Sequence, residues 1–216
     1  MKKFALVMLS MAFLLITIPG FATDFDFQGN FAKDNDVVQL NFTVASTSLV
    51  TVFSSSWLHP PEAGVPPGGF DPMLGIWTSS GTQMAFQDDG LNIGATLSNG
   101  FSYNHGYWDS YYQVSLDPGN YIATITEYDN FPNSGLLSDG FEHDSSPHFT
   151  TVWGPQPDFN GVWNFPDGTD PRTSFWQFHL LNVEQASQVP EPATMLLLGS
   201  GLIGLAGYGR KKFIKK

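Results

Sequence analysis

Apolar residues alternate with polar residues in the clearest stretch of this sequence, which is the pattern of a β-strand with one buried face. The members of the apolar face in residues 36–44 are Val38, Leu40, Phe42 and Val44. Between residues 23 and 188, no run of ten residues shows the 3.6-residue spacing of an amphipathic helix. The sequence therefore predicts an all-β fold for this region, which we call the body.

Further β-rich runs are separated by turn residues. They are predicted as strands at residues 48–53, 73–77, 83–87, 111–116, 121–127, 150–153 and 175–183. The runs 111–116 and 121–127 are expected to pair as a hairpin around Pro118 and Gly119, because proline followed by glycine suits a type II turn. Many short strands with intervening turns predict an antiparallel β-sandwich.

The charge of the body is strongly negative. Residues 23–188 hold nineteen of the twenty acidic residues but only Lys33 and Arg172 of the nine basic ones, which gives a formal charge of −17. Such a polyanion repels nucleic acid and anionic lipid head groups, so no nucleic-acid partner is expected. The chain has no cysteine, which excludes disulfides and thiolate chemistry.

The N-terminus has the three parts of a secretory signal peptide. Two lysines follow Met1, an apolar run covers residues 4–18, and small residues stand at Gly20 and Ala22. We expect residues 1–22 to form the signal peptide and cleavage to fall between Ala22 and Thr23. An uncleaved membrane anchor is the alternative.

The C-terminal segment, residues 189–216, also has three parts. Val189, Pro190, Glu191 and Pro192 form an extended motif, and residues 193–209 carry no charge. As a helix, those residues would span about 25 Å, near the lower limit for a transmembrane helix. The cluster 210–216, which includes Arg210, Lys211 and Lys212, would stop translocation and stay in the cytoplasm. The body, residues 23–188, is therefore expected on the far side of the membrane.

This order of motif, apolar span and basic cluster resembles the PEP-CTERM sorting signal of Gram-negative bacteria. The resemblance rests on Pro190, Glu191 and Pro192 at the family's P-E-P core. It implies export by the secretion machinery, transient anchoring in the inner membrane with the body in the periplasm, and recognition and cleavage by an exosortase. The outer surface or the exopolysaccharide matrix would be the destination.

Part of the body resembles a second family, the bacterial pre-peptidase C-terminal domain. The matching motifs lie, in order, in residues 36–44, 71–76, 86–89 and 116–121. This resemblance implies a jelly-roll-like β-sandwich without catalytic activity. It also implies that calcium or polysaccharide is a ligand class to consider.

Acidic turn residues suggest where a calcium ion would bind. Calcium takes six to eight oxygen ligands, which acidic loops often supply. Asp71, Asp88 and Asp89 are the best candidates, but the EF-hand spacing is absent, and ordinary turn formation by Asp and Asn is the alternative explanation. Acids at 34–36 and at 167–170 form two further clusters.

A long insertion, residues 129–174, is rich in glycine, proline and aromatic residues. Loops of this length in compact domains are uncommon and are often functional. If Trp163 and Trp176 are exposed, they are candidates for stacking on sugar rings. If they are buried, they form a hydrophobic lid on the sandwich.

No motif for catalysis is present in the sequence. It has no G-x-S-x-G, no H-E-x-x-H and no glycine-rich phosphate loop in the body. The hypothesis is a non-catalytic surface or matrix protein with a structural or adhesive role. The alternatives are a calcium- or glycan-binding module of the exopolysaccharide matrix and a polysaccharide-processing enzyme.

Overall fold

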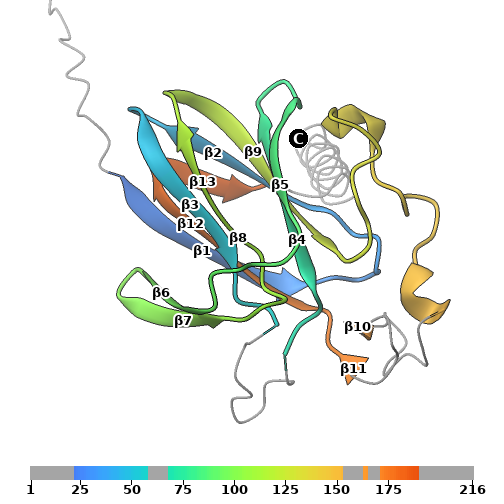
Figure 1. The fold of residues 1–216 in the computed structure, drawn as a ribbon. Helices are drawn as coiled ribbons and strands as arrows, with labels where there is room; N and C mark the ends of the chain where they lie inside the picture. The colour runs from blue at the N-terminus through green and yellow to red at the C-terminus, as the bar shows by residue number, and fades with distance from the viewer. Residues whose placement is uncertain (1–21, 58–67, 153–162, 165–170, 190–216) are drawn as a thin grey trace, which may run out of the picture.

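The computed structural model describes residues 22–57, 68–152, 163–164 and 171–189 (Figure 1). The strands are β1 (Thr23–Asn30), β2 (Val38–Val44), β3 (Ser48–Ser54), β4 (Pro72–Thr78), β5 (Gln83–Gln87), β6 (Gly94–Ser98), β7 (Phe101–His105), β8 (Tyr111–Leu116), β9 (Gly119–Glu127), β10 (Trp163–Asn164), β11 (Pro171–Arg172), β12 (Phe175–Val183) and β13 (Gln185–Gln188). Two short 3₁₀ helices, η1 (Leu137–Asp139) and η2 (Phe149–Val152), complete the set.

The strands form two main antiparallel sheets, with the orders β1-β12-β3-β8 and β13-β2-β9-β4-β5. Four strand pairs are nested along the chain: β4 with β5, β3 with β8, β2 with β9, and β1 with β12. A long hairpin that folds over into two sheets has this nesting, which defines a jelly roll. The prediction of an all-β, jelly-roll-like sandwich is confirmed.

The core lies between the two sheets and comes from alternate residues of facing strands. Leu40 and Ile125 from one sheet, and Val52 and Phe178 from the other, are each at most 1% exposed. Each buried side chain of this kind stabilises the fold by roughly 1.5–3 kcal/mol. The face predicted for residues 36–44 is the face that the structure buries.

The predicted hairpin of residues 111–116 and 121–127 is wrong in its pairing. Strand β8 pairs with β3, whereas β9 pairs with β2 and β4 in the other sheet. Residues 117–118 therefore form a corner between the sheets, and Gly119 does not adopt the positive φ that a type II turn requires. Sequence showed the strands and the break between them, but the partner of each strand depends on burial across the whole sandwich.

The β6–β7 hairpin was not predicted, and it lies over the outer face of the first sheet (Figure 1). The Ser98 hydroxyl donates to Asp26 Oδ1 at 2.5 Å, and the Tyr103 ring lies 4.1 Å from the His179 ring. Strands β1 and β13 were also missed. Strand β1 has only Phe25 and Phe27 as large apolar residues and β13 has none, so the apolar signal of both segments is short.

The described part of the long insertion, residues 129–152, covers the outer face of β4. Trp77 points outward from β4, yet it is 0% exposed because Phe141 and its neighbours lie over it, with ring centroids 6.4 Å apart. The strand predicted at residues 150–153 is wrong over its described residues, 150–152, because the chain forms η2 there. The Asp34 carboxylate accepts hydrogen bonds from the backbone N–H and the hydroxyl of Thr150, which hold this turn.

Several predictions fall outside the described residues. Residues 1–21 of the predicted signal peptide, the motif from Pro190 onward and the apolar span 193–209 are among them. Strand β1 begins at Thr23, directly after the predicted cleavage site. Within the part of the chain that the structure describes, no helix has the length and apolar character needed to cross a bilayer.

Candidate cation site

Three predicted carboxylates come together at one end of the β4–β5 hairpin. Asp71 directly precedes β4, and Asp88 and Asp89 directly follow β5. Antiparallel pairing, with Leu74 opposite Gln87, places the start of one strand beside the end of the other. One carboxylate oxygen from each aspartate lies within 4.8 Å of those of the other two.

Burial makes this cluster unlike a solvated acidic surface. Asp71 is only 6% exposed, and the Oδ1 atoms of Asp71, Asp88 and Asp89 are buried without a hydrogen bond to any described residue. Glu127, opposite Pro72 on β9, is 1% exposed, and its Oε2 atom also has no hydrogen bond among these residues. Buried acceptors left in this state each cost about 1–3 kcal/mol.

The electrostatic environment opposes ionisation. Burial, with the charges of Asp89, Asp88 and Asp109, raises the pKa of Asp71 to about 9, although Arg172 acts in the other direction. Burial and the charge of Asp89 raise the pKa of Asp88 to about 6.

Glu127 is perturbed in the same direction. Burial, followed by the charges of Asp34, Asp71 and Asp129, raises the pKa of Glu127 well above its usual range. Of these two carboxyls, Asp71, with a pKa of about 9, keeps its proton at neutral pH when no cation is bound.

Tight backbone packing fixes the loop that carries Asp88 and Asp89. Asp89 adopts a left-handed φ of 62°, and the Gly90 N–H donates to the Tyr107 carbonyl at 3.0 Å. A Cβ atom at Gly90 would lie 2.4 Å from the Asp109 carbonyl oxygen. The Ser110 hydroxyl lies between the carbonyls of Pro72 (2.7 Å) and Gln87 (3.0 Å), so it ties together the two strand ends that position the carboxylates.

The donor set fits a hard divalent cation. Calcium–oxygen bonds are about 2.3–2.6 Å long, so two ligands of one ion lie up to about 5 Å apart, which matches the 4.8 Å limit here. A bound cation would be held by Asp71, Asp88 and Asp89, and it would favour their ionised forms.

Glu127 was missed at the sequence level. It stands at the end of an alternating strand, where an acid usually faces solvent. The next candidate cluster, at residues 34–36, has a structural role instead. Asp36 Oδ2 accepts backbone hydrogen bonds from Ala32 and Lys33, as ordinary turn formation predicts. The acids at 167–170 lie outside the described residues.

The prediction that Trp176 could stack on a sugar ring is corrected. Trp176 is 2% exposed and belongs to the hydrophobic core, because it points inward from β12 beside Phe178 and Leu180 at alternate positions. A buried ring offers no face to a ligand. Strand β10 contains Trp163, but its side chain is not among those described.

A buried Ser–His–Asp arrangement lies beneath the β6–β7 hairpin. His179 Nδ1 is 2.6 Å from Asp26 Oδ1, and His179 Nε2 is 2.8 Å from Ser55 Oγ. Ser55 is 2% exposed and His179 is 0% exposed, and the Ser55 hydroxyl also contacts Gln177. A substrate cannot reach this hydroxyl, so the network holds the hairpin and sheet together. Burial lowers the pKa of His179, although Asp26 opposes that shift.

Comparison with protein families found one match. The description of the family model is PEP-CTERM protein-sorting motif, and it matches residues 188–211. No curated protein matches the chain. The matched segment begins at Gln188, the last residue of β13, and contains the predicted Pro190-Glu191-Pro192 motif. The chain is thus an exported protein with a membrane-anchored sorting tail, which the motif marks for processing by an exosortase.

Proposed function

We propose that this protein is a non-catalytic component of the cell surface or extracellular matrix, with a structural or adhesive role. The observation that carries this proposal is the sorting motif, which begins at the end of β13, the last described strand of the jelly roll. The Val189 N–H donates to the Gln39 carbonyl at 2.8 Å, so the described part of the sheet extends to the first residues of the motif. The inner membrane would hold the tail, and the outer surface or matrix of a Gram-negative cell would receive the body.

Two features of the described residues support a non-catalytic role. The hydroxyl of the Ser–His–Asp arrangement is buried. The clustered carboxylates of Asp71, Asp88 and Asp89 lie at the ends of β4 and β5, and their oxygen atoms suit the binding of an ion. An assay of the purified body with envelope polysaccharide should release no new reducing ends, and their release would refute this part of the proposal.

A second candidate function is calcium binding at Asp71, Asp88 and Asp89. The specific observation in its favour is the buried Oδ1 atom of Asp71, which has no hydrogen bond among the described residues. Because the surrounding charges also disfavour its ionised form, a divalent cation is the partner that would stabilise this carboxylate. The ion would fix the start of β4 to the end of β5.

Thermal melting with calcium tests this site. Residues 23–189 contain all the strands of both main sheets, so this segment is a suitable sample once circular dichroism shows that it is folded. Calcium should raise its Tm, since saturation at 100 times the Kd adds about 2.7 kcal/mol. Magnesium should have a smaller effect because it requires stricter octahedral geometry.

The control separates a specific site from general screening. The double variant Asp88→Asn/Asp89→Asn should lose the calcium response. The variant Glu142→Gln/Glu184→Gln changes the charge equally, lies outside the cluster and should keep the response. A wild-type Tm that does not move at millimolar calcium would rule the site out.

A further inference from the structure

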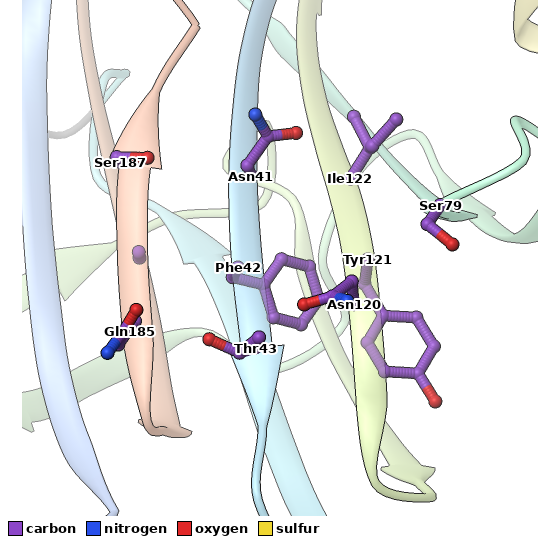
Figure 2. Close-up of a pocket in the computed structure, with 10 residues that line it drawn as sticks. Asn41, Phe42, Thr43, Ser79, Asn120, Tyr121, Ile122, Gln185 and Ser187 are labelled. Carbon is purple, nitrogen blue, oxygen red and sulfur yellow. The ribbon is translucent and has the colours of Figure 1, made fainter.

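A groove of about 390 Å³ lies on the five-stranded sheet across β13, β2 and β9 (Figure 2). Strand alternation directs one set of side chains from these three strands away from the core. The members of this set that line the groove are Asn41, Thr43, Asn120, Ile122, Gln185 and Ser187. Three neighbouring strands make a surface about 10 Å wide.

This part of the sheet is open, whereas its other half is covered. Residues 129–152 bury the outward side chains of β4, such as Trp77. Over the groove, Asn41, Asn120 and Gln185 are exposed. Among the described residues, the fold therefore leaves one half of the outer sheet face accessible to a ligand.

The groove is uncharged, although the body around it carries a formal charge of −17. Most of its outward side chains are amides and hydroxyls, which both donate and accept hydrogen bonds. Among the described residues, the side chains of Asn41, Asn120 and Gln185 have no hydrogen-bond partner. Their backbones are held in the sheet, and their side-chain donors and acceptors are available to a ligand.

Two aromatic rings lie beneath one end of the groove, on the core-facing side of the sheet. Phe42 and Tyr121 stack with centroids 5.4 Å apart, and the Tyr121 hydroxyl donates to the Asp117 carbonyl at 2.8 Å. That bond fixes the half-buried Tyr121 ring beside Asn120 (Figure 2). Phe42 is only 3% exposed, so these rings support the sheet under the groove. Contacts to a ligand would come from the outward amides, the hydroxyls and Ile122.

We propose that this groove binds an uncharged oligosaccharide chain. Its hydroxyls match the free amides and hydroxyls of the groove, and it escapes the repulsion that the acidic body exerts on acidic glycans and nucleic acids. An apolar ligand would leave the amides unpaired, which costs about 1–3 kcal/mol for each buried group.

The groove and the cation cluster are separate. Asn120 stands at the start of β9 and Glu127 at its end, which places them about 20 Å apart. The inference rests on the proposed matrix role in one respect only, which is that the extracellular matrix is where the protein would encounter the oligosaccharide. The binding assay tests the groove itself, and its result does not depend on calcium.

Affinity electrophoresis with soluble polysaccharides in the gel tests the proposal. The probes are a neutral β-glucan, a neutral mannan and a neutral galactan, with alginate as the acidic comparison. Residues 23–189 should be retarded by at least one neutral polymer and not by alginate. Asn41→Ala and Gln185→Ala should each weaken retardation about 3- to 10-fold, which is the loss of one hydrogen bond.

The matched control is Asn104→Ala. Asn104 is an exposed asparagine on β7, in the hairpin over the four-stranded sheet and away from the groove, so this variant should bind as the wild type does. Circular dichroism and thermal melting confirm that each variant is folded. The proposal is overturned if no neutral polymer retards the wild type, if alginate retards it more strongly, or if Asn104→Ala loses as much retardation as the groove variants.

Discussion

Asp71 is the residue on which the proposed cation site depends most. Its Oδ1 is buried, has no hydrogen bond among the described residues, and lies beside two other carboxylates. Sequence could identify Asp71, Asp88 and Asp89 because acids next to turn signals are visible in one dimension. It could not identify Glu127, whose burial depends on the strand that faces it.

Replacement of Asp71 by asparagine should have opposite effects with and without calcium. Without calcium at pH 8, Asp71→Asn should raise the free energy of unfolding by about 1–3 kcal/mol. The substitution removes a carboxyl that is ionised in the unfolded chain but whose ionisation the buried site opposes. With calcium, the variant should show little or no stabilisation, because a ligand is lost. Urea denaturation in EGTA and in calcium measures both effects, and a variant that is less stable than the wild type in EGTA would contradict this account.

The pH dependence of stability follows from the raised pKa of Asp71. In the unfolded chain this group titrates near 3.8, and in the folded protein near 9. The folded state therefore binds more protons between these values, so without calcium the free energy of unfolding should fall as pH rises through this window. Asp88, with a folded pKa of about 6, adds to the fall at its lower end.

Calcium should oppose this decline, because the ion competes with protons for the same carboxylates. The Tm shift that calcium causes should therefore be larger at pH 8 than at pH 5. The groups that act on Asp71 are Asp88, Asp89, Asp109, Glu127 and Arg172. Melting curves at both pH values measure the difference, and an equal or smaller shift at pH 8 would show that the ion binds elsewhere.

At the scale of elements, sequence predicted strands better than it predicted their partners. Strands β2, β3, β4, β5, β8, β9 and β12 were expected within one or two residues, since each has β-branched or aromatic residues in alternation. The strands it missed include β1, β6, β7 and β13. Of these, β1 has only Phe25 and Phe27 as large apolar residues, and β13 has none. The corner at residues 117–118 looks like a hairpin turn locally, and only the sandwich as a whole sends its two strands to different sheets.

The loop after β5 is the element that the cation site depends on. Gly90→Ala would place a Cβ atom 2.4 Å from the Asp109 carbonyl, so the loop must shift. We expect a loss of about 2 kcal/mol in stability and a weaker calcium affinity.

Gly135→Ala is the matched control, because a Cβ atom there meets nothing within 4 Å, and it should change stability by less than about 0.5 kcal/mol. Calorimetric calcium titration and thermal melting compare the two variants. Unchanged calcium affinity in Gly90→Ala would mean that the loop does not position the ligands.

At the scale of the whole molecule, a polyanionic sandwich is joined to a sorting tail. The tail was predictable because its signal is linear: a short motif, an apolar span and a basic cluster, and the match to residues 188–211 confirms it. The nested jelly-roll pairing was expected only from resemblance, since contacts such as that of β1 with β12 join residues about 150 positions apart. Long-range pairing of this kind leaves no local signal.

Native mass spectrometry of the protein recovered from its own cells, in calcium-containing medium, tests the central claim most directly. The account predicts a chain that begins at Thr23, ends within residues 189–192 and carries one calcium ion. A membrane-bound chain that still contains residues 210–216 would contradict processing at the sorting motif. A processed chain without calcium would contradict the cation site and leave the sorting assignment intact.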